Sequence, residues 1–262
     1  MPAGQHSAGA SMLIVAPIAA VAATRSHRVV DGLLPQGTGS FVTGHMGRGL
    51  KTRPAESIFP MAYLVEQDPD THLRPHFHDA DQFQVIVAGS GLLGKQPLTA
   101  LSLHFAAAAT PYGPIEAGPQ GIHYFTLRNG WDSGAKYLPE SRPQLLQRHR
   151  RPRSAAAGPL AVPDKAALAA GTQATLQTAI APAADGLAAW LVGTPPGAVA
   201  ASPAQDAGND QFWIVVRGKA MHAAQTLDPN SCIFVSRGEP PPGLVAGPRG
   251  LAVLVVQYPR YG

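Results

Sequence analysis

Two stretches of this chain repeat one another at a constant distance. Residues 81–89 read DQFQVIVAG and residues 210–218 read DQFWIVVRG, a shift of 129 positions. The same shift carries AGPQG at residues 117–121 onto AGPRG at residues 246–250. Two separate matches at one shift indicate tandem copies of a single structural unit. This repeat limits the chain to folds in which one architecture occurs twice.

The repeat divides the chain into four parts. The two copies are predicted to extend over residues 27–138 and 160–262. Between them, residues 139–159 are rich in Pro, Arg and Ala, which predicts a linker. Residues 1–26 are predicted to be a flexible N-terminal arm. Within this arm, residues 12–23 form an apolar run too short to cross a bilayer, which leaves a secretory signal or a strand packed on the protein as alternatives.

Composition favours strands over long helices. The chain has 28 Gly and 26 Pro, and these residues punctuate it with turns. Its 45% of hydrophobic and 14% of charged residues are sufficient for a packed core. Short apolar runs that end in glycine, such as residues 83–89, are typical of β-strands. We therefore predict an all-β fold.

Two histidines lie one residue apart just before the first repeated strand. His76 and His78 point to the same side of an extended chain, because side chains alternate between the two faces of a strand. Gln82 has the same parity, and His123 lies in a second strand-like run after a glycine-rich turn. Imidazole is a common ligand of zinc, iron, copper and nickel. We therefore predict a metal site of His76, His78 and His123, with Gln82 either a direct ligand or a neighbour that orients a ligand or water.

The second copy is an internal comparison for this site. The three positions that match the predicted histidine ligands hold Gln205, Ala207 and Ala252. The second copy is therefore expected to bind no metal in this manner and to act as a scaffold. Gln82 is kept as Gln211, which favours a structural hydrogen bond for this glutamine over direct ligation.

The spacing of these residues resembles that of the cupin superfamily. The first cupin motif is His-x-His, three or four residues, Glu, six residues and Gly. Here the histidine pair is followed at matching spacing by Gln82, in place of Glu, and by Gly89. The second motif is Pro-x-Gly-x-x-His, which residues 119–123 approximate with one residue fewer, and Asp70 and Leu127 stand where the family has Gly and Asn. The resemblance implies two tandem jelly-roll barrels, a bicupin, with one metal site in the N-terminal barrel.

The resemblance also implies a class of chemistry. Three neutral imidazoles leave the full charge on a divalent metal and up to three coordination positions open. Similar sites occur in bicupin dioxygenases of the gentisate type. This implies a non-haem Fe(II) dioxygenase that acts on a small organic substrate, with Gln82 orienting water or substrate. Two alternatives stay open: a non-oxidative cupin enzyme, such as an isomerase, decarboxylase or hydrolase using Mn, Ni or Zn, and a small-molecule-binding cupin without catalysis.

The remaining features point to a small molecule as the main partner. The basic run at residues 148–153 has no interleaved aromatic residues, so we expect no nucleic-acid partner. We expect no membrane partner and a cytoplasmic location, with export through residues 12–23 as the alternative. The resemblance implies that chains pair through strand edges as a homo-oligomer. His72 is expected on the surface or as an acid–base group at the pocket mouth, and His104 in the pocket or on the solvent face.

Overall fold

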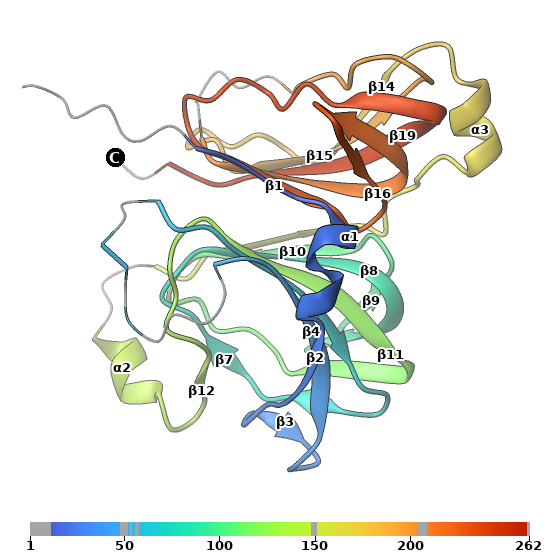
Figure 1. Ribbon diagram of the computed structural model, residues 1–262. Helices are drawn as coiled ribbons and strands as arrows, with labels where there is room; N and C mark the ends of the chain where they lie inside the picture. Colours follow the sequence, from blue (N-terminus) through green and yellow to red (C-terminus); the bar gives the residue numbers. More distant parts are fainter. Residues whose placement is uncertain are drawn as a thin grey trace, which may run out of the picture.

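The protein has the all-β fold that its sequence predicts. The computed structural model describes residues 12–47, 52, 54–55, 58–147, 151–203 and 209–260. About half of these residues lie in two large antiparallel sheets, one above the other (Figure 1). The helices are short: α1 (Ile18–Val21), α2 (Arg142–Leu146) and α3 (Lys165–Ala170), with one 3-10 turn, η1 (Ala22–Thr24). Over the described ranges, none of them is long and apolar enough to cross a membrane.

The N-terminal half is built on a ten-stranded sheet. Its central path is β13 (Ser154–Ala157), β10 (Leu103–Ala106), β8 (Gln82–Leu93), β11 (Ile115–Arg128), β5 (Met61–Gln67), β4 (Gly39–Met46) and β2 (Ser26–Val29). Off this path, β9 (Gln96–Thr99) pairs with β8, and β6 (His72–Leu73) pairs with β11 and with β3 (Leu33–Leu34). The strands β7 (His76–Phe77) and β12 (Lys136–Tyr137) form a separate small ladder.

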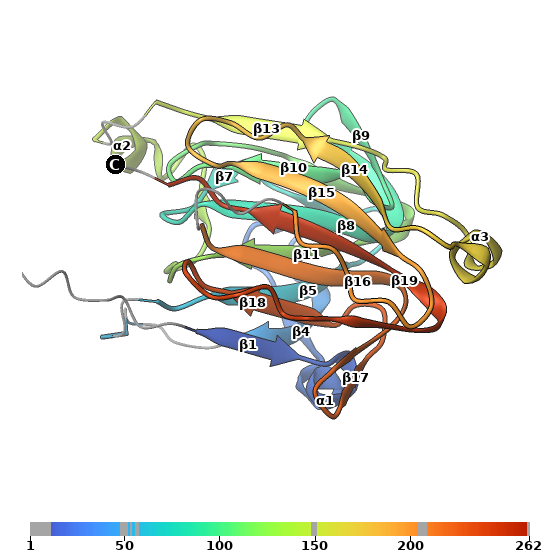
Figure 2. The same cartoon turned by 90° about the horizontal axis from the view of Figure 1, so that it is seen from above.

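The second half is built on a seven-stranded sheet. Its path is β1 (Leu13–Ala16), β18 (Cys232–Val235), β16 (Gln211–His222), β19 (Val245–Gln257), β15 (Ala188–Thr194) and β14 (Thr175–Ile180). The last strand, β17 (Gln225–Leu227), pairs with β16. Seen from above, the strands of the two sheets run roughly along one another (Figure 2).

The central strands of the two sheets pair in matching register at positions 129 residues apart. Phe83 of β8 pairs with Phe105 on one side and with Leu127 on the other. The residues 129 positions further on pair in the same way in the second sheet, Phe212 with Phe234 and with Val256. The glycine at the end of each matched run also has the same conformation, with φ of 73° at Gly89 and 77° at Gly218.

The two sheets pack face to face through one shared core. Phe83 and Phe105 enter this core from the N-terminal sheet, and Phe212 and Phe234 enter it from the second sheet. Tyr258 lies between them, with its ring centroid 5.2 Å from that of Phe83 and 6.1 Å from that of Phe212. Because side chains alternate along a strand, the neighbours of these residues point away from the shared core. They line the interior of each half, where a site can form.

Each sheet also takes one strand from outside the range predicted for its copy. The N-terminal strand β1 pairs with β18 of the second sheet, from Leu13 opposite Val235 to Ala16 opposite Cys232. The strand β13, from the predicted linker, pairs with β10 of the N-terminal sheet.

The predicted flexible arm is therefore corrected for residues 12–26, which contain β1, α1, η1 and the start of β2; residues 1–11 lie outside the described ranges. The physical reason is the apolar run itself. Ile14 packs against the shared core, while Leu13 and Val15 pack against the interior core of the second half. A strand that is apolar on both faces covers the sheet edge at β18, which would otherwise present unpaired backbone groups. Of the alternatives for residues 12–23, the packed strand is the one that the structure supports.

Candidate functional site

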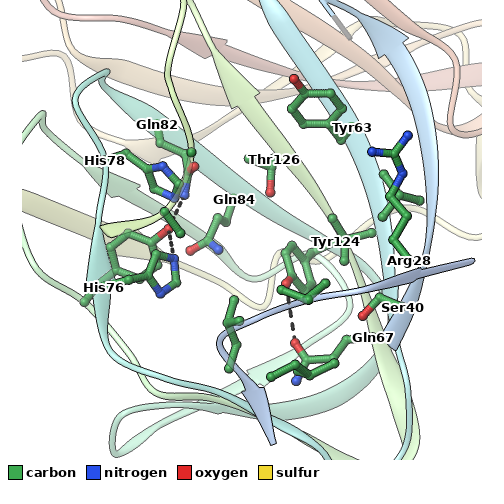
Figure 3. Close-up of a pocket in the computed structure, with 18 of the residues that line it drawn as sticks. Arg28, Ser40, Tyr63, Gln67, His76, His78, Gln82, Gln84, Tyr124 and Thr126 are labelled. Carbon is green, nitrogen blue, oxygen red and sulfur yellow. Dashed lines mark hydrogen bonds between the residues drawn. The ribbon is translucent and has the colours of Figure 1, made fainter. Parts of the chain in front are cut away.

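A pocket of about 380 Å³ lies on the inner face of the N-terminal sheet, the face turned away from the shared core (Figure 3). Strand register explains its lining. Thr126 of β11 pairs with Tyr63 of β5 and with Gln84 of β8, so these side chains lie in one row on the inner face. The small ladder of β7 and β12 brings His76 and Tyr137 to the same cavity. A cavity of this size suits a small organic molecule, for which pockets typically measure about 300–1,000 Å³.

The equivalent space in the second half is filled by apolar side chains. The positions of Gln84, His104 and Thr126 hold Trp213, Ile233 and Val255, all buried in one hydrophobic cluster. The pocket is thus not a by-product of the fold, because the same fold with other residues packs this space solidly.

His76 is buried and held as a neutral imidazole. Its Nδ1 lies 2.7 Å from the backbone oxygen of Arg74, an acceptor, so Nδ1 carries the proton. Its Nε2 then accepts a hydrogen bond of 2.9 Å from the Tyr112 hydroxyl. Burial lowers the pKa of His76 to about 4. The ring therefore presents a lone pair at Nε2.

His78 is held in the same tautomer by a carboxylate. Its Nδ1 donates to Oδ2 of Asp132 over 2.8 Å, and this carboxylate also accepts the backbone N–H groups of Asp79 and Gly134 at 2.8 Å each. The Arg128 guanidinium lies against the ring, with Nη2 3.1 Å from His78 Nε2. Burial and then the charge of Arg128 lower the pKa of His78 to about 3. Burial alone would raise the pKa of Asp132, but the hydrogen bond from His78 and the charge of Arg128 hold it well below its usual value.

Gln82 is buried beside these histidines, with one hydrogen-bonding atom unused. Its Nε2 donates to the Tyr112 hydroxyl over 2.5 Å, while its Oε1 has no partner within the described part of the chain. In the second half, Gln211 makes the structural bonds expected of it. Its Nε2 donates to Gln257 over 2.8 Å, and its Oε1 accepts from Trp213 over 2.9 Å. The glutamine of the N-terminal half therefore has a free acceptor that its counterpart lacks.

His123 does not join the other two histidines, which corrects the predicted three-histidine site. Ile122 and Tyr124 face the interior of the N-terminal half, so strand alternation places His123 on the opposite face of β11. Across the described ranges, no group of three or more His, Cys, Asp or Glu side chains is placed to hold a metal ion. The missing residue in the second motif explains the error. The family's Gly-x-x-His spacing, counted from Gly121, ends on Tyr124 and not on His123.

The other candidate histidines are placed as follows. His72 lies exposed on β6 and is not part of the pocket lining. His104 is buried, with Nδ1 3.3 Å from Oε1 of Gln84, and lines a small cavity behind the pocket. Burial lowers its pKa to about 4. Of the two positions predicted for His104, the structure supports the interior one.

We expect the metal-free protein to lose stability as the pH falls from about 7 to about 4.5. In this range the unfolded chain binds protons on histidines with an ordinary pKa of about 6.5, while folded His76, His78 and His104 stay neutral. Proton uptake therefore favours unfolding, by up to about 1.4 kcal/mol per histidine and pH unit. Chemical denaturation with a chelator present measures this slope, and the slope should be shallower in His78→Gln. A free energy of unfolding that stays constant over this range would contradict the neutral assignment.

Three residues of the site were not predicted from the sequence: Tyr112, Asp132 and Arg128. Tyr112 lies in a turn between strands, and its register with His76 comes from an isolated bridge. Asp132 lies a few residues after the end of β11, in a segment that the repeated sequence motifs do not include. Arg128 had one usable signal, since it lies two positions from Thr126 on the inner face of β11.

His76, His78 and Gln82 thus line one pocket and supply two imidazole nitrogens and one amide oxygen. His76 Nε2, His78 Nε2 and Gln82 Oε1 fit a divalent metal as a set of neutral donors. Two features favour this use: each Nδ1 proton is taken by a fixed acceptor, as is usual for metal-bound histidine, and Gln82 Oε1 is unpaired. Tyr112 and Arg128 now interact with the two Nε2 atoms, so they must yield these lone pairs to a metal.

No protein-family model and no curated protein matches this sequence. Solved structures do match at the level of the fold. The nickel(II) complex of the bacterial pirin YhhW from Escherichia coli is 14% identical, with a TM-score of 0.54, over 95% of this chain and 100% of that one. Quercetin 2,3-dioxygenase from Acinetobacter baumannii is 12% identical, with a TM-score of 0.53, over 95% and 79%. Oxalate decarboxylase from Lactobacillus farciminis, in complex with formate, is 12% identical, with a TM-score of 0.54, over 98% and 89%. The chain has the cupin fold.

Proposed function

We propose that this protein is a metal-dependent cupin enzyme that acts on a small, oxygen-bearing organic molecule in the N-terminal pocket. His76 Nε2, His78 Nε2 and Gln82 Oε1 hold a divalent metal, with Fe(II) as the first candidate. The observation that carries this proposal is the pair of buried imidazoles with fixed Nδ1 protons beside an unpaired amide oxygen. Similar structures include a dioxygenase, a decarboxylase and a nickel complex, which supports a metal-based chemistry without choosing among them.

The donor set resembles the two-histidine, one-carboxylate triad of non-haem iron oxygenases, with an amide in place of the carboxylate. When bound, such a metal supplies Lewis acidity and open positions for substrate and dioxygen. The residues of the chain orient the metal ligands and supply hydrogen bonds. Asp132 and the Arg74 carbonyl orient the two rings, while the Tyr112 hydroxyl donates to His76 Nε2 and would turn this proton to another acceptor when a metal takes that lone pair. The amide brings no negative charge, so an anionic substrate would balance the metal better than a neutral one.

The test is elemental analysis of protein purified without a histidine tag. We expect one divalent metal per chain in the wild type and none in His76→Ala, which should still fold. Gln82→Ala should retain part of the metal, because two imidazoles remain. His123→Ala is the matched control, since it removes a histidine on the opposite face of β11, and it should retain full metal. Full occupancy in His76→Ala, or loss in His123→Ala, would overturn the site.

Metal identity and oxygen consumption then separate the enzyme classes. Iron together with substrate-dependent uptake of dioxygen supports the oxygenase. Manganese, nickel or zinc without dioxygen uptake supports an isomerase, decarboxylase or hydrolase at the same site.

A second candidate is a small-molecule-binding cupin without catalysis. One observation favours it: Tyr112 and Arg128 already interact with the two Nε2 lone pairs that a metal needs. A wild type that retains no metal after incubation with iron, manganese, nickel and zinc in turn would select this candidate.

A further inference from the structure

One pair of neighbouring side chains differs between the two halves in a way that points to the ligand. Gln82 and Arg128 pair across β8 and β11, and the matching residues Gln211 and Gln257 pair across β16 and β19. In the second half, the two glutamines bond directly to each other over 2.8 Å. In the N-terminal half, the equivalent pair leaves two buried atoms without a hydrogen-bond partner among the residues that the structure describes, Gln82 Oε1 and Arg128 Nε. The second half therefore has a closed polar contact where the N-terminal half, with Arg128 at the position of Gln257, has an open one.

Arg128 is nearly buried, at 6% exposure, and its charge is only partly compensated. Its nearest carboxylate is Asp132, at 3.8 Å from Nη1, which is an ion pair without a short hydrogen bond. The oxygens of Asp132 are already engaged by His78 and by two backbone N–H groups. A buried guanidinium normally uses its planar fork of donors on a carboxylate or phosphate. Here the fork makes no short bond to a carboxylate among the described residues: Nη1 lies 3.8 Å from Asp132, Nη2 lies against the His78 ring, and Nε has no partner.

The charge of the pocket lining also favours an anionic ligand. Among the described residues that line the cavity, Arg28 and Arg128 are cationic and none is Asp or Glu. Ten of the other lining residues are Tyr, Val, Leu or Ala, among them Tyr63 and Tyr124, which Figure 3 labels. These tyrosine and aliphatic side chains suit a ligand with an apolar or aromatic body, while the polar side chains of the lining can hold its polar groups.

We propose that the natural ligand of the N-terminal pocket is a small organic monocarboxylate with an aromatic or other apolar body, and that Arg128 binds its carboxylate. This inference rests on the proposed function for its location and deepens it by naming the substrate class. Arg128 is a specificity-determining residue in this account, and Gln82 Oε1 is available to accept a donor from the same ligand or to bind the metal.

The test compares a carboxylate with its neutral analogue. Benzoate and benzamide have the same ring and similar size, and they are titrated by calorimetry into wild-type protein, once metal-stripped and once reloaded. We expect the wild type to bind benzoate at least about tenfold more tightly than benzamide, as a charge-assisted hydrogen bond to a buried arginine requires. Arg128→Gln copies the second half and should abolish this preference. Arg128→Lys keeps the charge without the fork and should retain a reduced preference.

Arg217→Gln is the matched control, because it removes a half-buried arginine from the second half, where its Nη1 bonds the backbone oxygens of Val162 and Pro163. Its preference for benzoate should equal that of the wild type. Equal affinity for benzoate and benzamide in the wild type overturns the proposal, and so does an unchanged preference in a folded Arg128→Gln or, if that variant does not fold, in Arg128→Lys. A protein that prefers benzoate through Arg128 but holds no metal overturns the metal site alone. A protein that holds metal without this preference overturns the role of Arg128 alone.

Discussion

Replacement of Asp132 by alanine is expected to lower the free energy of unfolding of the metal-free protein by about 3–5 kcal/mol, the range typical of a buried ion pair that loses one partner. The Asp132 side chain is fully buried, and it compensates both the Arg128 guanidinium and the Nδ1 proton of His78. Its removal leaves a buried cation without its carboxylate and frees the His78 ring to rotate. Chemical denaturation followed by circular dichroism, with a chelator present, measures the loss.

Two further variants show whether this cost comes from the buried charge. Asp228→Ala breaks the ion pair with Lys219, whose side chains are 37% and 51% exposed, and should cost at most about 1 kcal/mol. The double variant Asp132→Ala, Arg128→Gln should recover part of the loss, because no unpaired cation remains. A cost for Asp132→Ala no larger than for Asp228→Ala would show that Arg128 and His78 do not depend on this carboxylate. The same series tests the orientation of His78, since metal content should fall with Asp132→Ala.

The fold could be predicted from the sequence because its signal is repeated. The run that ends in Gly89 and the run that ends in Gly218 contain the same alternation and the same turn, so one copy checks the other. The N-terminal arm could not be predicted in this way. The pairing of β1 with β18 joins residues more than 200 positions apart, and a short apolar run does not specify which edge it will cover.

The candidate site could be predicted in part. His76, His78 and Gln82 line one pocket, and all three lie at the same parity of one strand-like stretch; their binding of a metal stays a prediction. His123 was misplaced because a deviation of one residue in the second motif reverses the face to which a strand side chain points. Asp132 and Arg128 depend on where the chain goes after β11 and on how side chains meet in space. Neither is encoded in spacing along the chain.

The matched positions Trp213 and Gln84 give the second large effect. Trp213→Ala is expected to lower the free energy of unfolding by about 3–5 kcal/mol, because it leaves a large cavity in a packed apolar core and removes the hydrogen bond to Gln211. Gln84→Ala, at the equivalent position of the N-terminal half, is expected to cost less than about 1.5 kcal/mol. Its side chain faces an existing cavity and makes one long bond of 3.3 Å to His104.

Measurement of both variants by urea denaturation tests how the two halves divide their roles. Trp213→Ala should leave the affinity for benzoate and the metal content unchanged, since Trp213 is separated from the N-terminal pocket by the shared core. Gln84→Ala should change ligand affinity while it leaves stability nearly intact. Equal losses of stability would mean that the N-terminal interior is as tightly packed as the second and that its pocket closes without a ligand. A larger loss of stability for Trp213→Ala than for Gln84→Ala would mean that the tightly packed second half contributes more to stability. The N-terminal half would then be less tightly packed, because its interior contains the ligand pocket.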